Sequence, residues 1–181
     1  MTASTVAPAI ALDELLRRPD LPHQLNQARE ALRAAGYGWL IDQGDAAVTD
    51  THARLRDLVD RNGGAFVPTP VDQHPDWVRL PIFATLADWL AGRARTCIHN
   101  PTPRRPQPVH AAAWKPGLVT CNDCIALFLL RRDSPKNRTC DGCGYVIDPG
   151  RGEKIWPTVI SCGVLSYQVA ACADCLYWDT P

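Results

Sequence analysis

The fold is decided by the stretch from Cys97 to Cys175, which contains four short ligand pairs: Cys97-Ile98-His99, Cys121-Asn122-Asp123-Cys124, Cys140-Asp141-Gly142-Cys143 and Cys172-Ala173-Asp174-Cys175. All eight cysteines of the 181-residue chain lie in this stretch. A two-residue spacer lets both thiolates of a pair reach one metal ion from a tight turn. Four such pairs predict two tetrahedral Zn²⁺ sites per chain, one with three cysteines and a histidine and one with four cysteines.

We expect the ligand pairs to combine in sequence order, because each unit then holds its own strands and turn between its two pairs. Cross-braced pairing, like that of RING domains, closes longer loops, but the difference in entropy cost is only about 0.5 kcal/mol. Cross-bracing therefore stays open as an alternative. The predicted first site consists of Cys97, His99, Cys121 and Cys124, and the predicted second site of Cys140, Cys143, Cys172 and Cys175.

The fourth ligand of the first site is open between two histidines. Cys-x-His is a shorter spacer than usual, and His110 competes with His99, which we favour. Cys162 lies among strand residues without a paired cysteine, so we expect a small, buried apolar side chain there. The other histidines show no ligand spacing and are expected at the surface or as caps: His23, His52 and His74.

Composition points to a globular protein in a reducing cytoplasm. The hydrophobic fraction is 46%, and the longest apolar run, residues 125–130, is too short to cross a bilayer. Residues 1–5 lack the charged and apolar regions of a secretory signal. Reduced Cys-x-x-Cys pairs favour metal over disulfides or redox activity. The excess of arginine over lysine, 16 to 3, together with many alanines and prolines, suggests a GC-rich bacterial genome.

Charge is divided between the two halves of the chain. Residues 1–92 carry a formal charge of −4 and residues 93–181 a charge of +4. Seven thiolates and two Zn²⁺ ions reduce the charge of the second half to about +1, because the ions must be counted with their ligands. Any attraction for a polyanion must therefore come from local clusters of basic residues.

The first 92 residues show mainly helical periodicity and predict a helical domain. A ten-residue acidic connection, 36–45, and the negative charge disfavour a DNA-binding helix-turn-helix. We expect a disordered segment at 1–9, a short strand or extended segment at 37–41 and a Pro-rich loop at 65–80. Helices are expected from residue 10 to about 16, at about 22–35, at about 45–61 and at 82–90.

Residues 93–138 form the first predicted zinc unit. Strands at 110–114 and 118–120 flank a Lys-Pro-Gly turn, and the Cys121 pair leads into an apolar segment, 125–130, expected to be helical. A ligand pair, a hairpin and a second pair at a helix start resemble the treble-clef class of zinc fingers.

Residues 139–181 form the second predicted unit. A knuckle at 140–144 precedes expected strands at 145–147, 154–160 and 164–171, and a second knuckle follows them. This order resembles a zinc ribbon, with a short final helix starting at residues 176–178. Residues 119–125 align with 170–176, which indicates a weak tandem repeat. The predicted fold class is thus α+β, with a helical domain followed by two zinc-stabilised β-rich units.

We expect a binding protein rather than an enzyme. The chain has no His-Glu-x-x-His motif, no P-loop and no deaminase His-x-Glu signature. Four protein ligands also leave a zinc ion with no open position for a substrate. Treble clefs and zinc ribbons serve transcription, translation, replication and protein docking, so the resemblance implies a small bacterial regulator or adaptor.

Nucleic acid is the expected partner, because two clusters of basic residues flank the zinc ligands. The alternative is a zinc-scaffolded protein–protein module anchored by aromatic side chains. The sequence indicates no membrane partner and no small-molecule substrate. The first basic cluster is Arg93, Arg95, Arg104 and Arg105, and the second is Arg131, Arg132, Lys136 and Arg138. The candidate protein anchors are Trp156, Tyr167, Tyr177 and Trp178.

Overall fold

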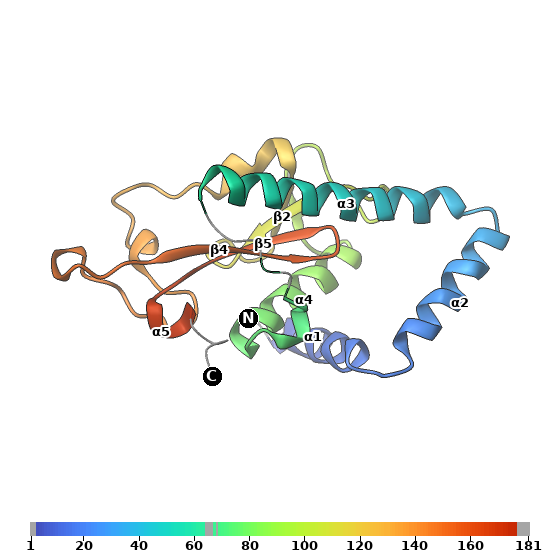
Figure 1. Ribbon diagram of the computed structural model, residues 1–181, viewed down its shortest axis with the longest axis horizontal. Coiled ribbons are helices and arrows are strands. Elements are labelled where there is room, and N and C mark those ends of the chain that lie inside the picture. The colour runs from blue at the N-terminus through green and yellow to red at the C-terminus, as the bar shows by residue number, and fades with distance from the viewer. Residues whose placement is uncertain (1–2, 64–66, 68, 177–181) are drawn as a thin grey trace.

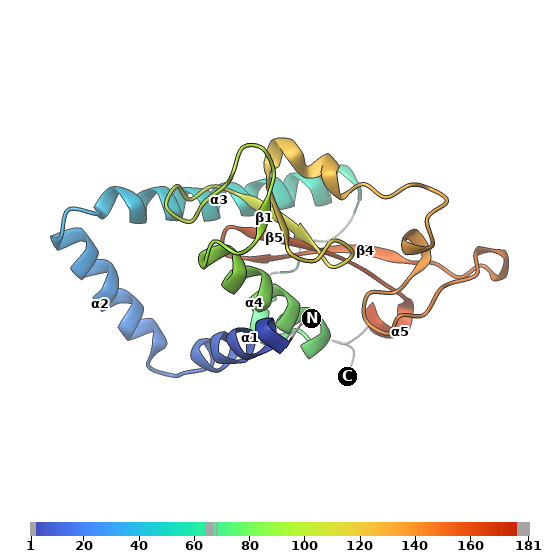
Figure 2. The ribbon, with the colours of Figure 1, turned by 180° about the vertical axis from the view of Figure 1, so that it is seen from behind.

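The computed structural model, which describes residues 3–63, 67 and 69–176, has the predicted α+β fold. A mixed sheet has α3 across one face and α1 and α4 on the other, while α2 bridges α1 and α3 at one end of the molecule (Figures 1 and 2). None of the described helices combines the length and apolar character that crossing a membrane requires. The helix bounds are Ala3–Leu16 for α1, Leu21–Ala34 for α2, Gly38–Arg61 for α3 and Asp76–Leu90 for α4.

Helices α1 and α3 both begin about seven residues earlier than the sequence predicts. α1 starts at Ala3, inside the segment expected to be disordered, and buries Ala9 completely. α3 starts at Gly38, so the strand predicted at 37–41 is wrong and most of it forms the first turn of α3. The apolar run in 39–41 fits a strand locally. In the structure Ile41 is instead buried on a long helix that also buries Leu55. Packing of the whole helix therefore outweighs the local preference for a strand.

The loop predicted at 65–80 is also too long. α4 begins at Asp76, so Trp77 belongs to a helix, and Pro81 is accommodated inside it. An ion pair fixes α4 to α1, since Arg79 Nε lies 2.8 Å from Asp13 Oδ1 with both side chains largely buried. Arg79 also pairs with Asp76 at 2.7 Å. This network orders the start of α4, where the proline pattern alone indicated a loop.

The connection between α2 and α3 is only three residues long, 35–37, rather than ten. Gly36 has a φ of +84°, a left-handed conformation that favours glycine and reverses the chain direction tightly. Cross-helix ion pairs hold the two helices together, Arg29 with Asp45 and Arg33 with Asp42. α2 buries no residue of its own, so its apolar side chains stay at the surface.

The sheet joins the two predicted zinc units. Its strand order is β1-β3-β2-β5-β4. The pairs β2–β3 and β4–β5 are antiparallel hairpins, and β2 pairs with β5 in parallel from Val109↔Leu165 to Ala112↔Gln168. The strands are β1 Arg95–Thr96, β2 Val109–Ala112, β3 Leu118–Cys121, β4 Trp156–Cys162 and β5 Leu165–Ala171.

Three local predictions in this half need correction. The strand expected at 145–147 is reduced to one bridge, Thr139↔Val146. The helix expected at 125–130 is a 3₁₀ segment, η2 (Asn122–Phe128). The final helix begins earlier than 176, as α5 (Ala173–Leu176), and residues 177 and 178 lie outside the described part. The remaining short helices are η1 (Val71–Gln73), η3 (Pro135–Arg138) and η4 (Pro149–Arg151).

One hydrophobic core connects the helices to both hairpins. Ile82 and Phe83 of α4 are fully buried and belong to the same cluster as Val109 of β2 and Leu165 of β5. The predicted units 1–92, 93–138 and 139–181 therefore all contribute side chains to a shared interior. Their boundaries as domains remain a sequence prediction, while their packing in the structure is continuous.

The shared core predicts that a cavity in α4 destabilises the zinc half as well. Phe83→Ala should lower the free energy of unfolding by about 3–5 kcal/mol, because a large buried ring is lost. Sheet and helix signals should then melt together at a lower temperature in circular dichroism. Leu25→Ala on α2, where the side chain is 52% exposed, is the control and should leave the melting temperature nearly unchanged. A helical transition separate from the sheet transition would contradict the shared core.

Candidate metal centres and a basic cleft

The first ligand tetrad gathers at the end of the β2–β3 hairpin. Cys121 Sγ lies 3.7 Å from Cys97 Sγ and 3.2 Å from His99 Nδ1, and Cys124 Sγ lies 3.3 Å from the same nitrogen. A tetrahedron with Zn–S bonds of about 2.3 Å has S···S edges of about 3.8 Å. The first sulfur pair matches such an edge and is far from the roughly 2.05 Å of a disulfide.

The second tetrad gathers beyond the β4–β5 hairpin and contains Cys140, Cys143, Cys172 and Cys175. Its four sulfur atoms lie within 4.8 Å of one another, with 3.9 Å between Cys143 Sγ and Cys172 Sγ. All eight cysteines are free thiols. The spacing again fits four ligands around one ion.

The ligand pairs combine in sequence order in the structure. Cys97 and Cys140 belong to different tetrads, so the arrangement is not cross-braced. Each tetrad combines the pair that precedes a hairpin with the pair that follows it. The hairpin therefore acts as the spacer that returns the second pair to the first.

Backbone N–H groups favour the thiolate form of one cysteine in each tetrad, Cys97 and Cys140. The N–H of Cys121 lies 3.5 Å from Cys97 Sγ, and that of Cys172 lies 3.4 Å from Cys140 Sγ. Burial raises the pKa of the Cys97 thiol, but nearby N–H groups outweigh it and lower this pKa to about 7. The same opposition of burial and N–H groups lowers the pKa of Cys140 to about 7. The thiolate is the form that binds metal.

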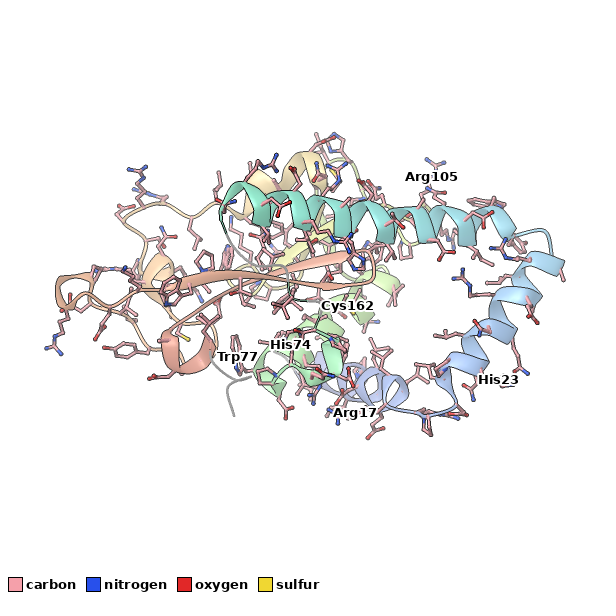
Figure 3. All side chains as sticks on the ribbon, viewed as in Figure 1. Arg17, His23, His74, Trp77, Arg105 and Cys162 are labelled. Atoms are coloured by element: carbon pink, nitrogen blue, oxygen red, sulfur yellow. The ribbon has the colours of Figure 1, made fainter. Side chains whose placement is uncertain are left out.

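The second tetrad is supported directly by α4. A Cβ atom at Gly142 would come within 3.0 Å of the Trp77 ring and 3.1 Å of Cys175 Sγ, so only glycine fits between them. Figure 3 shows Trp77 next to α5, the helix that carries Cys175. The contact ties the knuckle to the helical layer.

Other candidate ligands lie outside the tetrads. His110 is buried in β2, and burial lowers the pKa of its imidazole despite an opposing hydrogen bond with the Asn122 side chain. Cys162 is half-buried against the core, and burial raises its thiol pKa to about 11 (Figure 3). His74 is only 7% exposed and stands at the C-cap of η1, so of the two expected roles the cap is confirmed and the surface position is wrong; its carbonyl accepts a hydrogen bond from Arg79. His23 is exposed on α2.

The four arginines of the first basic cluster differ in their local partners. Arg93 is paired with Asp88 at 2.8 Å, and Arg95 Nη2 donates to the Pro116 carbonyl. Arg104 and Arg105 are exposed on the loop between β1 and β2, and Figure 3 shows Arg105 beside α3. None of these four side chains lines the cleft described next.

The second basic cluster lines a cleft of about 1290 Å³ between the sheet, α3 and the segment after β3. Figures 1 and 2 show that segment, residues 122–138, on the same side of the sheet as α3. Arg131 does not line the cleft and pairs with Asp133 instead. Among the described residues, six cations line the cleft against two carboxylates, Asp57 and Glu153. The cations are Arg54, Arg61, Arg132, Lys136, Arg138 and Lys154.

Sequence reasoning missed three of these cations, Arg54, Arg61 and Lys154. Arg54 and Arg61 are seven residues apart on α3, which is two helical turns, so they share one face of the helix. This spacing was available in the sequence, but only the long α3 and its position on the sheet bring it opposite the second cluster. Both arginines also pair with an aspartate four residues earlier, Asp50 and Asp57.

Comparison of the chain with protein-family models, with curated proteins and with solved structures finds no significant match in any of the three. The function must therefore be argued from the tetrads and the cleft.

The tetrads predict two Zn²⁺ ions per chain that are lost separately. Cys143→Ser should remove the second ion and His99→Ala the first, because each variant leaves only three ligands. Cys162→Ala and His110→Asn, outside the tetrads, should keep both ions. Native mass spectrometry of the intact chain counts them directly. One ion in the wild-type protein, or loss of both ions from Cys143→Ser, would contradict two independent sites.

Proposed function

We propose that the chain is a non-enzymatic nucleic-acid-binding protein whose sheet is held by two structural Zn²⁺ ions. The donor sets support zinc, because cysteine thiolates with one histidine are typical of structural zinc sites. Four protein ligands in each tetrad leave no coordination position for a substrate. In both units a ligand pair, a hairpin and a second ligand pair follow one another, which supports the resemblance to treble clefs and zinc ribbons. That resemblance favours a role as a small regulator or adaptor.

The cleft is the observation that carries the proposal. Its cations outnumber its carboxylates three to one in a chain with no net formal charge, so the positive charge is concentrated there. Four of the cations have no ion-pair partner among the described residues: Arg132, Lys136, Arg138 and Lys154. Unpaired basic side chains around a groove are suited to phosphate contacts, which supply most nonspecific affinity for nucleic acid.

Protein docking is the second candidate, and α2 is the feature that favours it. Leu25 and Leu32 are exposed on α2, and Trp39 is 56% exposed at the start of α3. Of the aromatic anchors expected from the sequence, Tyr167 is only 3% exposed, so its ring is not accessible to a partner. Trp156 is exposed but lines the basic cleft, and Tyr177 and Trp178 lie outside the described residues. We rank this candidate below nucleic acid.

Charge reversal in the cleft tests the proposal. Arg132→Glu with Arg138→Glu should weaken binding of mixed-sequence oligonucleotides at low salt by about ten-fold or more, and should flatten the dependence of log K on log salt concentration by about one unit or more. Arg104→Glu with Arg105→Glu is the matched control, because it reverses the same charge outside the cleft. Fluorescence anisotropy with single-stranded and duplex probes measures both effects.

If the two double variants lost the same affinity for oligonucleotides, binding would depend on the overall charge of the protein and not on the cleft. Absence of binding to any DNA or RNA probe at low salt would reject the nucleic-acid proposal and favour protein docking on α2.

A further inference from the structure

A row of polar side chains crosses one face of the sheet, and its members His110, Ser166 and Gln168 line the cleft. Thr120 of β3 is paired with His110 of β2, His110 with Ser166 of β5, and Ser166 with Ser161 of β4. Paired residues project from the same face of a sheet, so the four side chains cross it in one line. Gln168 lies two residues beyond Ser166 on the same face and is a diagonal neighbour of His110.

Three polar atoms in this row have no hydrogen-bond partner in the described part of the chain: His110 Nε2, Thr120 Oγ1 and Gln168 Nε2. Thr120 is completely buried and His110 is 7% exposed. Buried polar groups are almost always paired, since leaving one unpaired is costly. His110 and Gln168 also line the cleft. The unpaired atoms of His110 and Gln168 therefore mark a position where a bound molecule supplies the missing hydrogen bonds.

The walls of the cleft are aromatic and apolar. Trp114 lines it and is fixed in place, because its Nε1 donates to the Phe128 carbonyl at 2.9 Å. Trp156 lies at the rim, but it pairs with Ala171 and so projects from the face of the sheet opposite to Gln168. Leu58 of α3 and Ile125 of η2 add exposed apolar surface. An aromatic ring such as Trp114 beside a basic groove is the arrangement on which an unpaired base stacks.

We propose that the cleft binds single-stranded nucleic acid, with an unpaired base stacked on the aromatic wall and its edge directed toward His110 and Gln168. The cations at the rim contact the phosphates on either side of that base. This inference rests on the proposed function and narrows it to a substrate class. A duplex does not meet these requirements, because its base faces are stacked inside the helix and its hydrogen-bonding edges are largely paired.

The test compares a single strand with the duplex of the same sequence and length, using the full chain with both zinc ions bound. The single strand should bind at least about ten-fold more tightly. Trp114→Leu should weaken single-strand binding by about ten-fold, in the range found when one base loses its aromatic partner, and should leave duplex binding unchanged. A strand of the same length made of abasic nucleotides should bind the wild-type protein as weakly as the duplex does.

Gln168→Met tests the polar row, because it keeps the side-chain length and removes the amide. It should weaken single-strand binding and alter the preference among homopolymers of different bases. Gln73→Met is the matched control, since Gln73 is exposed on η1 and does not line the cleft. Zinc content and melting temperature of each variant verify folding, and the abasic strand, which requires no variant, keeps the test informative if Gln168→Met unfolds.

The outcomes separate this inference from the proposal on which it rests. Equal affinity for single strand and duplex, with no effect of Trp114→Leu, would overturn the inference and leave nucleic-acid binding intact. Failure of every oligonucleotide to bind would overturn both. Loss of a protein partner on Trp114→Leu, without any oligonucleotide binding, would assign the cleft to a peptide.

Discussion

The parallel pairing of β2 with β5 sets the rest of the fold. Each tetrad closes a two-stranded hairpin, and an isolated hairpin of this size is marginally stable in water. Pairing from Val109↔Leu165 to Ala112↔Gln168 joins the two hairpins into one surface broad enough for α4 to cover. The buried cluster of Ile82, Phe83, Val109 and Leu165 exists only because these strands lie side by side.

The proposed zinc ions and the helical layer then stabilise different parts of the same sheet. Metal binding contributes roughly 10 kcal/mol or more in small zinc domains, and here it would fix the chain where β3 and β5 end. The helices cover the middle of the sheet, and Trp77 connects the two by packing on Gly142. Loss of the metals would therefore also disturb the surface on which α1 and α4 pack. The stability of the helical half thus depends on the sheet.

The sequence predicts what is local and misses what is distant. Cys-x-x-Cys spacing is set by a single turn, and the same eight ligands meet in the two tetrads of the structure. The antiparallel hairpins were also predictable, because a turn signal separates their strands. The β2–β5 pairing joins segments more than 50 residues apart, and no short-range pattern encodes it. The strand predicted at 37–41 failed for the same reason, since the burial of Ile41 depends on where the whole of α3 lies.

Alternation along β5 explains why one face of the sheet is closed and the other hollow. Leu165, Tyr167 and Val169 point to the face that α4 covers, whereas Ser166 and Gln168 point to the face below α3. An apolar helix packed tightly over those polar groups would bury them without partners, which is unfavourable. α3 instead buries only four of its 24 residues, and its last turns carry arginines toward the space that remains. The cleft is thus a consequence of the sheet's polar face, and the same residues that prevent close packing there are the ones available to a ligand.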